Sequence, residues 1–130
     1  MFTGAKLAAV RETSPMTSES GVVVVAEVHG LVGRLPELKA LLADLAESTR
    51  REPGCRSYHV AFPDEPGECL LVGLWSGEAA LRAHYRTDGY LHYRGQVGEL
   101  LARPSDVVVH HVSATVSARD PNPPDPSLLG

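Results

Sequence analysis

The sequence has few cysteines and aromatic residues, no excess of positive charge and no long apolar run. Two cysteines in 130 residues are too few for the disulfide framework of a small secreted domain. Lysine and arginine number 12 against 16 acidic residues, so the net charge of −4 argues against a nucleic-acid-binding surface. No apolar run reaches the roughly 18 residues that a membrane-spanning helix needs, and residues 1–20 lack the apolar core of a secretory signal. We therefore predict a cytoplasmic protein that binds neither nucleic acid nor membrane.

What is present is the composition of one ordinary globular domain, with 43% hydrophobic and 22% charged residues. The last stretch, ARDPNPPDPSLLG, is rich in proline and cannot bury a core face. We predict a flexible leader over residues 1–20, a folded domain over 21–116 and a flexible proline-rich tail over 117–130.

The first half of the domain predicts a strand, a helix and a second strand. Residues 22–28 read VVVVAEV, a short β-branched run typical of a buried strand. Pro36 suits the first turn of a helix over residues 35–48, and Pro53-Gly54 ends that helical region. In residues 55–62, large apolar side chains occur at every second position, as expected of a strand. Leucines at positions 35, 38, 41, 42 and 45 form the apolar stripe of the helix.

The second half predicts a strand over residues 69–75, a short helix over 77–85, a helix over 90–102 ended by Pro104, and a strand over 107–116. The complete order is β-α-β-β-α-α-β. This order matches the ferredoxin-like α+β fold, a four-stranded antiparallel sheet with helices on one face.

Three of the predicted strands also indicate an assembly. Residues 22–25, 69–75 and 107–109 do not alternate between apolar and polar, so both faces of the sheet should be buried. Because the helices can cover only one face, we predict a homodimer in which two copies pack sheet against sheet. A cavity or a loop over the second face is the alternative.

A cluster of aromatic and basic side chains between positions 75 and 94 is the candidate site. More than half of the chain's aromatic residues lie there, and they would line a pocket between the helices and the sheet. Each residue taken alone has a plainer interpretation, since a tryptophan that ends a strand is often core and a helical histidine is often solvated. The members of this cluster are Trp75, His84, Tyr85, Tyr90, His92, Tyr93 and Arg94.

The histidines do not predict a metal site. His110 and His111 are adjacent on a predicted strand and point to opposite faces of the sheet. His84 and His92 lack the i, i+4 spacing of a helical metal site and have no obvious third ligand. His29 is isolated on its strand. We therefore predict no metal and no cofactor.

Two passages carry a resemblance to a known family. They are EPGCxSY, from Glu52 to Tyr58, and W-S-x-E-A-A-L-x-A-H, from Trp75 to His84. The chain resembles the antibiotic biosynthesis monooxygenase family over residues 22–112. This resemblance implies a dimeric α/β barrel of ferredoxin-like subunits. It also implies an activity like that of members that oxidise anthrone-like or hydroquinone-like polyketides to quinones without a cofactor.

The resemblance can be followed position by position. Trp75 and His84 stand at the strand tryptophan and helix histidine of the family, and Arg94 is a stand-in for an arginine that contacts substrate or oxyanion. In the haem-degrading branch the positions of Val28, His84 and Arg94 hold other residue types, so we do not expect haem degradation. Departures from the oxygenase pattern are Leu71 in place of an asparagine, Gly73 in place of an acidic residue and Gly89 in place of a second histidine.

The leading hypothesis is a cofactor-free monooxygenase that acts on a small aromatic substrate and molecular oxygen. His84 is the predicted base, and Trp75, Tyr90 and Arg94 are candidate donors to developing negative charge. The alternatives are a cyclase, an isomerase or a small-ligand-binding module on the same scaffold, and a stable dimer without catalysis. The residues predicted to bind substrate are Tyr85, Tyr90, His92 and Tyr93.

Overall fold

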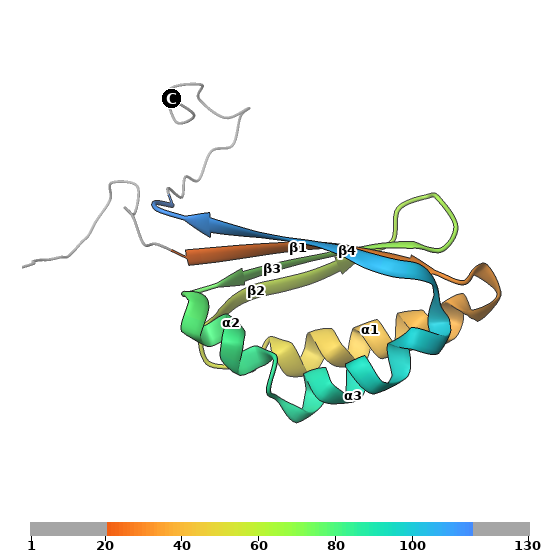
Figure 1. The fold of residues 1–130 in the computed structure, drawn as a ribbon, viewed down its shortest axis with the longest axis horizontal. Coiled ribbons are helices and arrows are strands. Elements are labelled where there is room, and N and C mark those ends of the chain that lie inside the picture. Colours follow the sequence, from red (N-terminus) through yellow and green to blue (C-terminus); the bar gives the residue numbers. More distant parts are fainter. Residues whose placement is uncertain (1–20, 116–130) are drawn as a thin grey trace, which may run out of the picture. The chain divides into compact units, whose positions relative to one another are not determined.

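A computed structural model of the chain describes residues 21–115. The predicted leader and tail lie outside this range. Figure 1 shows the ferredoxin-like α+β architecture that the sequence predicts, with the strands and helices in the predicted order. No helix in the described part of the chain is long and apolar enough to cross a membrane. The elements are β1 (Gly21–Gly30), α1 (Leu35–Thr49), β2 (Cys55–Ala61), β3 (Glu68–Trp75), α2 (Glu78–His84), α3 (Asp88–Val97) and β4 (Leu101–Val112), with single 3-10 turns at Val32–Arg34 and Gly98–Leu100.

The four strands form one sheet in the order β2-β3-β1-β4, and the helices cover one face of it (Figure 1). The central strands β1 and β3 are antiparallel and place Val25 opposite Val72. The hairpin partner β2 places Tyr58 opposite Gly73. On β3 the alternate residues that face the helices are buried, which agrees with the two-residue period of a strand.

The core lies between α1 and the central strands. Leu38 and Leu42 of α1 are both 0% exposed, as the leucine stripe predicts. Gly30, at the end of β1, is needed there because a Cβ atom would lie 2.3 Å from the Leu38 side chain. Its N–H donates to the Gly67 carbonyl at 2.7 Å, so the turn before β3 is fastened to the end of β1.

The C-terminal part differs from its prediction. Helix α3 begins at Asp88, capped by Thr87, whose hydroxyl accepts from the Tyr90 N–H at 3.2 Å. It ends at Val97, and β4 starts at Leu101, where the sequence predicts helix. Pro104 therefore lies inside β4 and does not end a helix. The position is permitted because β4 is an edge strand, where a missing N–H need not break a ladder.

The middle of the sheet face that points away from the helices is apolar and only partly covered within one chain. Val25 and Val72 on the central strands are half-buried, and Val108 on β4 is 51% exposed. The sequence predicts that this face is fully buried. A single copy of the chain leaves it open.

Candidate functional site

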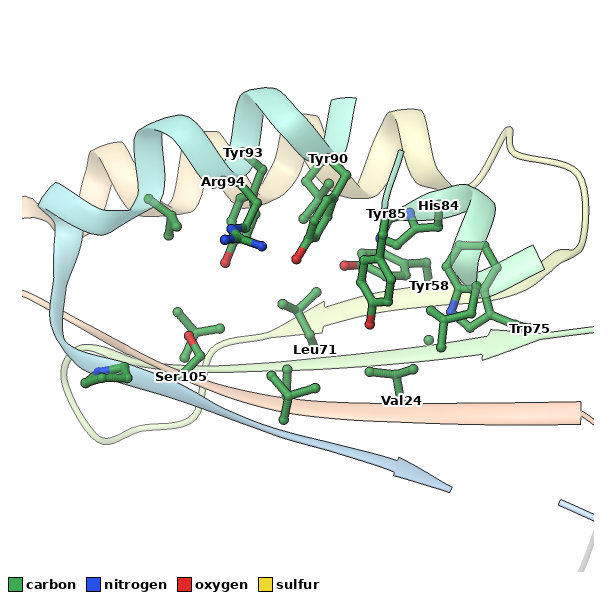
Figure 2. Close-up of a pocket in the computed structure, with 18 of the residues that line it drawn as sticks. Val24, Tyr58, Leu71, Trp75, His84, Tyr85, Tyr90, Tyr93, Arg94 and Ser105 are labelled. Carbon is green, nitrogen blue, oxygen red and sulfur yellow. The ribbon is translucent and has the colours of Figure 1, made fainter. Parts of the chain in front are cut away.

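A cavity of about 500 Å³ lies between the sheet and the helices α2 and α3 (Figure 2). Strands β1 and β3 contribute Val24, Leu71 and Gly73 to its floor, and β4 contributes Ser105. No carboxylate lines it among the described residues. The predicted site residues found in its lining are Trp75, His84, Tyr85, Tyr90, Tyr93 and Arg94.

His92, predicted to bind substrate, lies outside this cavity. Residues three or four positions apart lie on the same side of a helix, and the side of α3 that lines the cavity carries Tyr90, Tyr93, Arg94 and Val97. His92 is on another side of the helix, exposed along the groove between α1 and α3. The reason that His92 lies away from the other predicted residues is helical periodicity, which a list of residues that are close in sequence does not capture.

His84 lies at the centre of the aromatic lining, although it is only 3% exposed. Its ring centroid lies 4.7 Å from that of Trp75 and 5.0 Å from that of Tyr90. The rings of Tyr85 and Tyr58 follow at 5.4 and 6.0 Å. The imidazole is thus enclosed by π surfaces, which suit a planar aromatic ligand stacked beside it (Figure 2).

Glu52 holds this histidine in one orientation. The His84 Nδ1 atom lies 3.0 Å from Glu52 Oε1 and 3.2 Å from Oε2, and both side chains are largely buried. Because a carboxylate only accepts, Nδ1 carries the proton and the lone pair of the neutral ring is on Nε2. Nε2 has no hydrogen-bond partner among the described residues and is not sealed from solvent. The pair therefore presents a proton acceptor to the cavity.

The turn between α1 and β2 explains why Glu52 reaches His84. Gly54 has a φ of +84°, which favours glycine, and a Cβ atom there would lie 2.5 Å from the Ala80 side chain. Its carbonyl accepts from the Ser76 N–H at 2.8 Å, which docks the turn against the start of α2. The two passages that carry the family resemblance therefore pack against each other and contribute to the same site. The sequence analysis missed Glu52, although EPGC was the available signal.

Gly73 makes room for two rings of the lining. A Cβ atom at this position would lie 3.0 Å from Trp75 Nε1 and 3.1 Å from Tyr58 Cδ1. The indole and phenol rings meet edge to face, with centroids 6.5 Å apart. Without a side chain at position 73, both rings pack against the floor of the cavity, and Trp75 is 1% exposed. Tyr58, another lining residue that the sequence analysis missed, is opposite Gly73 on β2.

Three tyrosines of the lining hold their protons more strongly than a free phenol does and can act as hydrogen-bond donors. Burial is the main cause that raises the pKa of Tyr93 to about 12, and it also raises the pKa of Tyr58 and of Tyr85. Arg94, at the exposed rim, has no ion pair within residues 21–115. The cavity therefore offers hydroxyl donors, one guanidinium and one histidine to a neutral or anionic aromatic molecule.

Known proteins share this arrangement of sequence and fold. The sequence profile of the antibiotic biosynthesis monooxygenases matches residues 21–96. The chain belongs to this family. It is 40% identical over 90 residues to Rv0793 of Mycobacterium tuberculosis, whose name provisionally assigns a monooxygenase activity, and the match covers 69% of this chain and 89% of that protein.

Solved structures agree with this assignment. The structure of Rv0793 has a TM-score of 0.67 at 39% identity, covering 69% of this chain and 92% of the other. Protein SO0527 of Shewanella oneidensis has a TM-score of 0.67 at 31% identity, covering 77% and 97%. A conserved protein of Methanosarcina mazei, at 24% identity, has a TM-score of 0.69 and covers 73% and 95%, which shows the fold alone.

The antibiotic biosynthesis monooxygenase match includes the whole Glu52–His84 pair and every aromatic residue of the cavity. It ends before β4, which closes one side of the cavity through Leu101, Ser105 and Val107. The matched range thus contains all the predicted site residues, while part of the cavity wall comes from outside it.

Proposed function

We propose that this chain is a cofactor-independent monooxygenase that oxidises an electron-rich aromatic molecule, anthrone-like or hydroquinone-like, to a quinone. The observation that carries the proposal is the Glu52–His84 pair at an aromatic cavity: within residues 21–115, the second imidazole nitrogen has no hydrogen-bond partner and no carboxylate lines the cavity. Family membership supports the monooxygenase class. Molecular oxygen is the second substrate.

The reaction begins with proton transfer to His84. Nε2 takes a proton from the activated CH₂ group of an anthrone-like substrate, and the Glu52 carboxylate stabilises the imidazolium that forms. The resulting carbanion reduces oxygen, and recombination forms a carbon–oxygen bond in a peroxide. Loss of water, with a proton returned by His84, leaves a carbonyl. One oxygen atom and both hydrogens of the CH₂ group leave as water, and the other oxygen atom remains in the quinone.

Negative charge develops on the substrate oxygen while the carbanion exists. The phenol of Tyr90, the indole N–H of Trp75 and the guanidinium of Arg94 are donors in the lining that can stabilise this charge. A buried aromatic site strengthens such hydrogen bonds because little water competes with them. The substrate is therefore expected to stack beside His84 with its oxygen toward these donors.

The test is oxygen uptake by flavin-free, metal-stripped protein with a panel of anthrones and hydroquinones under ¹⁸O₂. With the anthrones we expect one oxygen molecule consumed per quinone, with one labelled atom in the product. His84→Ala should reduce kcat by about 10²- to 10⁴-fold, the usual contribution of a positioned base, and Trp75→Phe should also be impaired. The control His92→Ala changes a histidine of the same helical region outside the cavity, so its rate should be unchanged. Equal rates for His84→Ala and the wild type would contradict the proposal, as would unlabelled product.

A non-oxidative cyclase, an isomerase or a ligand-binding module is the second candidate. Leu71 and Gly73 add no polar side chain to the β3 wall of the cavity, and the Glu52–His84 pair can move a proton whether or not oxygen is present. Substrate conversion that proceeds equally well under anaerobic conditions would favour the cyclase or isomerase.

We also infer that a second copy of the chain covers the open face of the sheet. Val25 and Val72 are cross-strand partners in the middle of that face, and Val108 extends the apolar surface onto β4. Burying such a face is favourable at about 25 cal/mol per Å². Light scattering after gel filtration should give a dimer mass for the wild type and a monomer mass for Val72→Glu. A monomeric wild type would contradict the inference.

A further inference from the structure

A second buried histidine lies on the opposite face of the sheet from the cavity. His29 on β1 is 3% exposed, and three carboxylate side chains surround it. Its Nδ1 atom lies 2.8 Å from Glu68 Oε1 of β3, and its Nε2 atom lies 2.9 Å from Asp106 Oδ2 of β4. Glu27 is the third acidic neighbour, two residues earlier on the same face of β1. None of these residues lines the cavity.

Both ring nitrogens of His29 thus face groups that only accept hydrogen bonds. A neutral imidazole donates from one nitrogen and accepts at the other, so it satisfies one carboxylate and repels the second. The arrangement needs an additional positive charge at Nε2. Arg103 is the nearby basic group that acts on His29, and three carboxylates against one guanidinium leave an excess of negative charge. Either a second proton on the ring or a metal ion supplies the missing charge.

We propose that Glu27, His29 and Asp106 bind a divalent transition-metal ion, with zinc as the representative ion. The ligand atoms of the three side chains all lie within 4.8 Å of one another. Zinc bonds to nitrogen and oxygen are about 2.0–2.2 Å long, so small rotations of the two exposed carboxylates bring all three groups into bonding distance. One imidazole with two carboxylates is a donor set that zinc and manganese accept.

Glu68 acts as the residue that orients the metal-binding histidine. A ligating histidine commonly donates its other N–H to a carboxylate, which fixes the tautomer and leaves the second nitrogen free for the metal. The register of the central strands places His29 opposite Glu68. Gly67, with a φ of +85°, holds the preceding turn against β1, because a Cβ atom there would lie 2.6 Å from the Gly30 carbonyl oxygen. The strand register and the turn at Gly67 thus place Glu68 where it can orient the imidazole of His29.

The ion would fasten the edge strand to the centre of the sheet. Glu27 and His29 come from β1, and Asp106 comes from β4, which forms one edge. A ligand that binds only the folded state raises its stability by mass action, so zinc should raise the melting temperature. The site is separate from the cavity, and its failure would leave the proposed oxygenase activity untouched.

The experiment is zinc titration of the full chain without a polyhistidine tag, by calorimetry and by competition with a chromophoric chelator. We expect one saturable site per chain and a higher melting temperature with zinc. His29→Gln should lose the site, and Glu68→Gln should weaken it by about 10- to 100-fold, as for other residues that orient a ligand. His59→Gln, which changes an exposed histidine on β2, is the matched control and should bind as the wild type does.

Asp106→Asn keeps the test valid if His29→Gln does not fold, because the Asp106 side chain is 69% exposed in a single copy of the chain and lies outside the core of that copy. Loss of binding in Asp106→Asn with binding kept in His59→Gln supports the site. Absence of stoichiometric binding by the wild type overturns the proposal, and so does equal binding by the wild type and Asp106→Asn.

Discussion

The two buried histidines of this domain share one kind of hydrogen-bond partner and differ in the other. His84 and His29 are each 3% exposed, and each directs Nδ1 toward a glutamate, Glu52 or Glu68. At His84 the second nitrogen has no hydrogen-bond partner among the described residues, and aromatic rings lie around the imidazole, whereas at His29 the second nitrogen meets the Asp106 carboxylate. A glutamate–histidine pair therefore does not define a chemistry by itself. The group that faces the second nitrogen separates the proton acceptor that we propose at His84 from the cation site that we propose at His29.

The largest expected effect comes from changing the two glutamates separately. Glu52→Gln should lower kcat of the proposed oxygenase by about 100-fold or more with a smaller change in KM, because the amide no longer fixes the tautomer or stabilises the imidazolium. Glu68→Gln makes the same chemical change at the other histidine and should leave kcat unchanged. Steady-state kinetics on the two variants measure the difference. Equal losses would mean that the two histidines do not differ in role.

A medium effect is expected from the floor of the cavity beside His84. Gly73→Ala adds a Cβ atom 3.0 Å from Trp75 Nε1, so the indole must shift and ligand affinity should fall several-fold. The single tryptophan reports this directly through its fluorescence during ligand titration. Gly95→Ala is the control, because no atom lies within 4 Å of a Cβ atom there. An unchanged Kd and fluorescence spectrum in Gly73→Ala would show that the floor of the cavity is packed less tightly than these distances indicate.

The smallest effect concerns the phenols that line the cavity and have no counterpart around His29. The pKa of Tyr93 is raised to about 12, above the value of about 10 in an unfolded chain. The folded state then retains a proton that the unfolded state loses, so stability falls as the pH rises from about 10 toward 12. Between pH 10 and about 12, the free energy of unfolding of Tyr93→Phe should therefore fall less than that of the wild type. Urea unfolding at several alkaline pH values tests this, and parallel pH dependence in both proteins would contradict it.

The sequence predicted the fold well where local pattern is sufficient. The leucine stripe of α1 and the β-branched run of β1 are recognisable by their periods, and both elements were confirmed. The prediction failed at Pro104, where a local stop signal for a helix was overridden by the position of β4 at the sheet edge. Six residues of the cavity lining were also among the predicted site residues, because Trp75 and the residues of the α2–α3 region are close in sequence as well as in space.

Outside the start of β4, the chain by itself determined which segments become strands and helices and which aromatic side chains share a helix face, because these properties depend on periods of two and about 3.6 residues. Only the tertiary structure decided the partners of the two histidines. Glu52 and His84 are 32 residues apart, and His29 and Asp106 are 77 residues apart. Such pairs depend on how turns and strand order fold the chain back on itself. For that reason a histidine that looks isolated in the sequence is surrounded by carboxylates in the fold.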